Sequence, residues 1–122
     1  MSSECLVLKG IEGLVKGEEY NIELGETVVI GRSSKCDICL KYLYEDEEQK
    51  NPGGKQFNTV SREHIRISFH NLTTIEFEDL SSNGTYIDGK QITSHIISDA
   101  IVKNHQLQLG AKEKFLVMLE KN

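Results

Sequence analysis

The sequence of 122 residues contains no apolar run that approaches the roughly 20 residues needed to span a bilayer. It has no basic excess either: the formal net charge is −5, whereas proteins that bind nucleic acid normally carry a basic footprint. Its first residues, MSSECLVLKG, lack the basic segment followed by an apolar segment that marks a secretory leader. We therefore expect an intracellular, cytoplasmic protein that binds neither membrane nor nucleic acid, with a nuclear location open if the source is eukaryotic.

Cysteine is scarce, and the three cysteines cannot all pair within the chain, which is typical of a reducing compartment. Cys36 and Cys39 form a C-x-x-C sequence, which suggests a zinc or thiol-redox site. A zinc site would need two more ligands, but there is no second C-x-x-C and no closely spaced histidine pair. A thioredoxin-like motif should open a helix after a strand, and no capped helical pattern follows. We expect half-buried cysteines in a strand or turn, no metal ion and no cofactor.

Patterns typical of catalysis are also missing. The sequence has no paired-carboxylate site, no cysteine with an evident base and no Walker-type loop. A phosphatase would need a metal cluster or an activated nucleophile, and the sequence shows neither. We therefore expect a protein that is not an enzyme.

Alternation of apolar and polar residues is what the sequence has in abundance. The segment 64–70, HIRISFH, places two isoleucines and a phenylalanine on one face and polar residues on the other. Similar alternation occurs in segments 20–24, 74–80, 105–110 and 113–120, with hairpin joins at Lys16-Gly17, Asn71-Leu72 and Gly110-Ala111. No stretch shows a 3.6-residue period over three turns. Many short strands at regular spacing predict one domain over residues 1–122, an all-β antiparallel sandwich of two sheets.

One long segment, 41–59 (KYLYEDEEQKNPGGKQFNT), interrupts this rhythm. It contains the acidic cluster Glu45 to Glu48 and the only proline, Pro52, followed by two glycines. Connections of this length are uncommon in compact domains and are usually functional or disordered. We expect a long acidic loop, which is either functional or a tolerated, solvated insertion.

Two turn-forming pairs, Asn83-Gly84 and Asp88-Gly89, lie close together in the stretch DLSSNGTYIDGK. A single Asn-Gly or Asp-Gly pair between strands is enough to close a hairpin. Either the two pairs belong to one elaborate hairpin, or one of the turns presents its side chains to a ligand. Gly84 can adopt positive φ without a Cβ penalty, which leaves the Asn83 side chain to face a ligand.

Polar groups follow or precede the predicted strands at three places. They lie in IGRSSKCDI around Arg32, in VSREH around Ser61 and Arg62, and in LSSNGTYIDG around Ser82 and Asn83. Arginine offers a planar fork of N–H donors, and serine hydroxyls and backbone N–H groups can bond the remaining oxygens of an anion. Together these groups suit a dianionic phosphate.

The order G-R, then S-R-x-H, then N-G-T-Y-I-x-G resembles the forkhead-associated (FHA) domain, a phosphothreonine-recognition module. The resemblance covers residues 6–119, and its motifs lie between Gly31 and Gly89. It implies a SMAD/FHA-like sandwich with functional loops at one end. It also implies that the chain, as a monomer, binds a phosphothreonine-containing protein, the substrate of a Ser/Thr kinase, in a phosphorylation-dependent interaction in signalling.

The resemblance implies roles for individual residues. Arg32 would grip the phosphate and Ser61 would hydrogen-bond it, with Arg62 as a second contact. Asn83 would hydrogen-bond the peptide backbone beside the phosphothreonine, and Ser82 lies next to it on the same loop. The Asn83-Gly84 turn would thus shape the binding loop, and Asp88-Gly89 would close the hairpin. The residues expected to support the loops are Gly31, His64, Gly84 and Thr85. His64 would thus be structural, rather than a catalytic base or a metal ligand.

The sequence departs from the family pattern in two places. The segment before Ser61 is longer than usual, and NHQLQLG stands where the family often has a Gly-Asp turn. The carboxylates of the longer segment would favour basic residues beside the phosphothreonine. The alternative function is a phosphate-independent, self-associating or scaffolding β-sandwich, which a titration with matched phosphorylated and unphosphorylated threonine peptides would distinguish.

Overall fold

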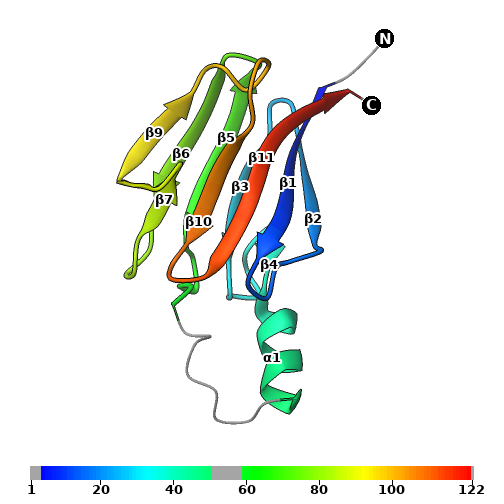
Figure 1. The fold of residues 1–122 in the computed structure, drawn as a ribbon, viewed down its shortest axis with the longest axis vertical. Helices are drawn as coiled ribbons and strands as arrows, with labels where there is room; N and C mark the ends of the chain where they lie inside the picture. Colours follow the sequence, from blue (N-terminus) through cyan, green and yellow to red (C-terminus); the bar gives the residue numbers. More distant parts are fainter. Residues whose placement is uncertain (1–3, 51–58, 122) are drawn as a thin grey trace.

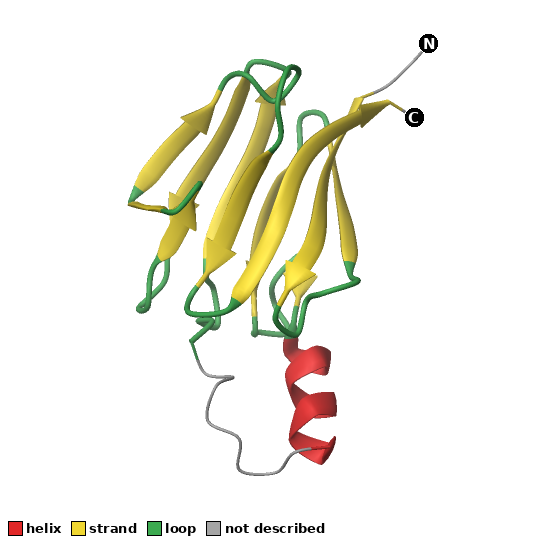
Figure 2. Cartoon of the chain, viewed as in Figure 1, coloured by secondary structure: helices red, strands yellow, loops and turns green. Residues whose placement is uncertain are grey.

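The computed structural model describes residues 4–50 and 59–121, which form two β-sheets and an α-helix (Figure 1, Figure 2). The elements are β1 (Glu4–Glu12), β2 (Glu19–Glu23), β3 (Thr27–Gly31), β4 (Ile38–Cys39), α1 (Lys41–Lys50), β5 (Ile65–Asn71), β6 (Thr74–Asp79), β7 (Thr85–Ile87), β8 (Lys90–Ile92), β9 (Ser94–Ile97), β10 (His105–Leu109) and β11 (Glu113–Lys121). One sheet has the strand order β2-β1-β11-β10-β7-β8 and the other β4-β3-β5-β6-β9. The predicted all-β sandwich is confirmed.

The strands predicted from alternation are present, and the three predicted joins each connect an antiparallel pair: β1 with β2, β5 with β6, and β10 with β11. The side chains between the sheets include Phe69 and Phe77 from one sheet and Phe115 from the other, all fully buried. Burying a side chain of this size stabilises the fold by roughly 1.5–3 kcal/mol. The apolar alternation therefore fixes which face of each sheet turns inward.

The pair β3 and β4 is parallel, which differs from the predicted antiparallel sheets. The chain leaves β3 at Gly31, doubles back, and returns alongside the same strand. Two hydrogen bonds hold this path: the Asp37 carboxylate accepts from the Val29 N–H at 2.8 Å, and the Leu40 N–H donates to the Gly31 carbonyl at 2.8 Å. The doubled-back segment, residues 32–37, lies at the end of the sandwich at which α1 lies (Figure 1).

Residues 41–50 form the helix α1, so the prediction of a loop over 41–59 is wrong for this part of the segment. Leu40 before the helix is fully buried, Tyr44 is buried and Leu43 is half-buried. These apolar positions cover little more than one turn, too little to give a helical period in the sequence. A helix this short gains its stability from tertiary packing rather than from propensity. Residues 51–58 lie outside the described part of the chain.

Side-chain hydrogen bonds fix α1 against the sandwich. The Tyr42 hydroxyl donates to the Glu18 carboxylate and lies 3.3 Å from the Tyr20 hydroxyl. The Tyr20 ring in turn meets the Phe115 ring edge-on, with centroids 6.1 Å apart. The helix is therefore held at a fixed place beside the strand ends.

The three cysteines are free thiols, with Cys36 buried in a turn and Cys39 half-buried in β4. The Cys36 thiol donates to the Arg62 carbonyl at 3.0 Å. Within residues 4–50 and 59–121, no group of three His, Cys, Asp or Glu side chains is placed to hold a metal ion. None of the helical structure in these ranges is long and apolar enough to cross a membrane.

His105, the first residue of β10, lies between two carboxylates. It belongs to segment 104–110, NHQLQLG, which departs from the family pattern. Its Nδ1 is 2.6 Å from Asp88 Oδ2, and its Nε2 is 2.6 Å from Asp99 Oδ1. Only the doubly protonated imidazolium can donate through both nitrogens. Burial lowers the pKa of His105, but the hydrogen bonds to Asp88 and Asp99 and their charges outweigh burial and raise it above its usual value.

This cluster predicts a pH dependence of stability. A histidine pKa that is raised by folding adds stability that is fully present below the unfolded pKa of about 6.5 and is lost as the pH rises through the folded pKa. The His105→Gln variant should therefore be less stable than the wild type at pH 6, and this difference should shrink toward pH 8.5. Urea unfolding of both proteins across that range measures it. A difference that stays constant with pH would show that folding does not shift the pKa of His105, and a difference that grows with pH would show that folding lowers it.

Candidate functional site

Three segments meet at the end of the sandwich that carries α1: residues 32–37, 59–64 and 80–84 (Figure 1). The Arg32 N–H donates to the Ser61 carbonyl at 3.1 Å, and the Ser33 N–H donates to the Arg62 carbonyl at 2.9 Å. The Ser82 N–H donates to the Ser61 hydroxyl oxygen at 3.0 Å. Segment 59–64 thus lies between the other two and is hydrogen-bonded to both.

Gly31 allows the first two segments to approach this closely. A Cβ atom at this position would lie 2.1 Å from the Arg62 carbonyl oxygen and 3.0 Å from the Glu63 Cα. Both contacts are with backbone atoms, which cannot move aside without breaking the hydrogen bonds between the segments. Any larger residue here would force the segments apart.

His64 is fully buried and joins the second and third segments. Its Nδ1 accepts a hydrogen bond from the Ser61 N–H at 3.0 Å, so its Nε2 carries the proton and donates to the Gly84 carbonyl at 2.9 Å. Burial lowers the pKa of His64 below its usual value, which favours this neutral form. These contacts link segment 59–64 to segment 80–84. The supporting role that the resemblance implies for His64 stays a prediction.

Asp79 organises the third segment and was not predicted from the sequence. Its Oδ1 accepts from the Ser81 N–H at 3.0 Å, the Ser81 hydroxyl at 2.6 Å and the hydroxyl of the buried Thr85 at 2.8 Å. Burial raises the pKa of Asp79, but these hydrogen bonds outweigh it and the pKa is lowered. An aspartate side chain in a turn often accepts a hydrogen bond from the backbone N–H two residues on, and an aspartate at the end of a predicted strand could have identified Asp79.

Both predicted turns have the expected backbone conformation. Gly84 has φ of 99°, which confirms the positive φ predicted for it. Asp88 and Gly89 have φ of 52° and 84° and join the antiparallel strands β7 and β8, as predicted for a hairpin. Positive φ at both central residues is the conformation that favours Asp-Gly in such turns.

The three segments enclose a surface hollow of about 630 Å³. All the residues predicted to contact a phosphopeptide line it: Arg32, Ser61, Arg62, Ser82 and Asn83. Glu63, Arg66 and Leu80 line it as well and were not predicted. Arg66 forms a 2.5 Å ion pair with Glu78, so the positive charge of the hollow comes mainly from Arg32 and Arg62.

The side chains in the hollow keep donors and acceptors for a ligand. The Arg32 Nε–H donates to the Val60 carbonyl, which uses one of the five N–H donors of its guanidinium. The Ser61 oxygen accepts from the Ser82 N–H, so its own hydroxyl proton can be donated elsewhere. The Asn83 amide nitrogen donates to the Thr59 carbonyl at 3.3 Å. This bond orients the amide, whose oxygen can accept a peptide N–H.

Both a family model and solved structures that resemble this chain are FHA domains. A family model described as FHA domain matches residues 28–110. The FHA domain of the CT664 protein from Chlamydia trachomatis is 26% identical, with a TM-score of 0.68 over 93% of this chain and 96% of that chain. The FHA domain of an Arabidopsis thaliana hypothetical protein is 22% identical, with a TM-score of 0.69 over 95% of this chain and 86% of that chain.

A third similar structure is described with a bound ligand. EmbR from Mycobacterium tuberculosis, in complex with a low-affinity phosphopeptide, is 21% identical, with a TM-score of 0.64 over 93% of this chain and 24% of that chain. No curated protein sequence matches the chain. The match of the family model covers the three motifs on which the predicted resemblance depends.

Proposed function

Because this chain belongs to the FHA domain family, we propose that it is a phosphothreonine-binding module that mediates phosphorylation-dependent protein–protein interaction. Two similar structures support this proposal. One comes from a study of phosphothreonine-dependent FHA domain interactions, and the other is EmbR in complex with a phosphopeptide. The observation that carries the proposal is the convergence of the predicted contact residues on one hollow. The partner would be a protein phosphorylated by a Ser/Thr kinase, and the module would act as a cytoplasmic monomer in signalling.

The chemistry of the hollow suits a phosphate dianion. The Arg32 guanidinium supplies a charged fork of donors, and the Ser61 hydroxyl supplies a neutral donor beside it. Arg62 adds a second positive charge from the same segment as Ser61. Asn83 would hold the peptide backbone next to the phosphothreonine, which orients the ligand rather than adding charge.

We propose that the module binds its ligand without chemical change. An activated serine nucleophile needs a base hydrogen-bonded to its hydroxyl. Neither ring nitrogen of His64 serves Ser61 in this way, because Nδ1 accepts from the Ser61 backbone N–H and Nε2 donates to the Gly84 carbonyl. Ser61 therefore fits the role of a hydrogen-bond donor better than that of a nucleophile.

A calorimetric titration with two threonine peptides of the same sequence, one phosphorylated and one not, tests the proposal. We expect the phosphorylated peptide to bind at least about tenfold more tightly, because charge-assisted hydrogen bonds contribute about twice as much as neutral ones. A degenerate phosphothreonine library would supply the sequences. Equal affinities would favour the phosphate-independent alternative, which sedimentation would then test as self-association.

A further inference from the structure

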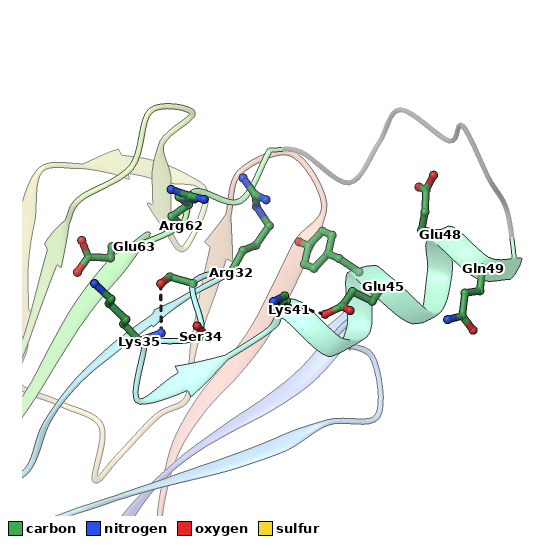
Figure 3. A pocket seen from close by; sticks show the side chains of 11 residues that line it. Arg32, Ser34, Lys35, Lys41, Glu45, Glu48, Gln49, Arg62 and Glu63 are labelled. Carbon is green, nitrogen blue, oxygen red and sulfur yellow. Dashed lines mark hydrogen bonds and ion pairs between the residues drawn. The ribbon is translucent and has the colours of Figure 1, made fainter.

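A second hollow, of about 900 Å³, lies between α1 and the segment that carries Arg32 (Figure 3). Arg32 and Arg62 line this hollow and also the one described above. The α1 groove, as we call it, is therefore continuous with the proposed phosphate site. Its wall on the helix side includes Lys41, Glu45, Glu48 and Gln49.

Charge changes sign along the α1 groove. One end of the groove contains Arg32, Arg62 and Lys35, together with Glu63. The helix side contains Glu45 and Glu48, which lie beyond Lys41 along α1 (Figure 3). Glu45 and Lys41 are 4.0 Å apart, with side chains 63% and 57% exposed. Ion pairs this exposed contribute little, so a cation on a ligand can compete for the Glu45 carboxylate.

The helix wall is fixed in place before any ligand binds. Tyr44 is buried beneath the groove, and Tyr42 hydrogen-bonds Glu18 on the sandwich. Carboxylates on a docked helix need less ordering upon binding than carboxylates on a flexible loop. A docked helix fits a functional segment better than it fits a solvated insertion, the alternative that the sequence left open.

We propose that the α1 groove binds the part of the phosphopeptide that runs from the phosphothreonine along α1, and that it selects lysine or arginine there. This inference rests on the proposed function and names its preferred ligands. From Lys41 to Glu48 the helix rises about 10 Å at 1.5 Å per residue, the length of about three extended residues. The selected basic residues therefore lie within about four positions of the phosphothreonine, on one side only.

The experiment uses three phosphothreonine peptides: one flanked by alanines, one with three lysines before the phosphothreonine and one with three lysines after it. Calorimetry should show that lysines on one side tighten binding about three- to tenfold, as expected for exposed ion pairs with the groove. The double variant Glu45→Gln with Glu48→Gln should lose this gain. The matched control is the double variant Asp46→Asn with Glu47→Gln, which changes the net charge equally on the same helix but outside the groove lining. This control should keep most of the gain in affinity that the lysines give.

The outcomes separate the two proposals. If none of the three phosphopeptides binds, the proposed function is wrong and the groove proposal falls with it. If the alanine-flanked peptide binds but lysines on neither side improve its affinity, only the groove proposal is overturned. Equal losses in the two double variants would also overturn it, because they would indicate a general effect of net charge.

Discussion

Replacing Arg32 by alanine should weaken the binding of a phosphothreonine peptide by at least about tenfold, since losing one partner of a desolvated, charge-assisted contact costs roughly 2–5 kcal/mol. The same substitution should also lower the stability of the folded protein. The Arg32 Nε–H donates to the Val60 carbonyl, and loss of this hydrogen bond should lower the free energy of unfolding by about 1 kcal/mol. Calorimetry and urea unfolding of the same preparation measure the two effects.

Two control variants sharpen this result. Arg32→Lys keeps the charge but loses the planar fork, so it should restore only part of the affinity. Arg66→Ala removes an arginine of the same hollow that is already paired with Glu78, so it should change affinity little. A folded Arg32→Ala variant with unchanged affinity would contradict the assignment of Arg32.

Replacing His64 by alanine should lower the free energy of unfolding by about 3–4 kcal/mol, through a buried cavity and two lost hydrogen bonds. The Ser61 N–H and the Gly84 carbonyl would both lose their partner on His64. Because these groups belong to two segments of the site, affinity should fall as a consequence of disorder. Urea unfolding, with affinity measured at a temperature where the variant is folded, gives both values.

The exposed His95 provides the matched control, and His95→Ala should change neither stability nor affinity. The opposite pattern at position 64 would be informative. If His64→Ala kept its stability and lost only binding, His64 would be a direct ligand contact and not a brace.

The sequence predicts most of the strands because alternation of apolar and polar residues directly records which face of a sheet is buried. It does not predict α1, because the apolar contacts of Leu43 and Tyr44 cover only the start of the helix. It does not predict the parallel pair either, because the two residues of β4 are too few to show a pattern. Both elements depend on tertiary contacts.

The predicted contact residues come from the family motifs, and the structure brings them to one hollow. The pairs that hold this end of the molecule in shape are widely separated along the chain. Tyr42 reaches back 24 residues to Glu18, and Asn83 reaches back 24 residues to Thr59. Such pairs leave no trace in a local pattern, so the α1 groove could not be derived from the sequence.

The most direct test of the central claim is a titration of the ¹⁵N-labelled protein with a phosphothreonine peptide, followed by amide NMR shifts. We expect saturable shifts at the backbone amides of Arg32, Ser61, Ser82 and Gly84, and none with the unphosphorylated peptide. Shifts confined to another surface, such as the strand β9, would contradict it. So would equal shifts with the unphosphorylated peptide.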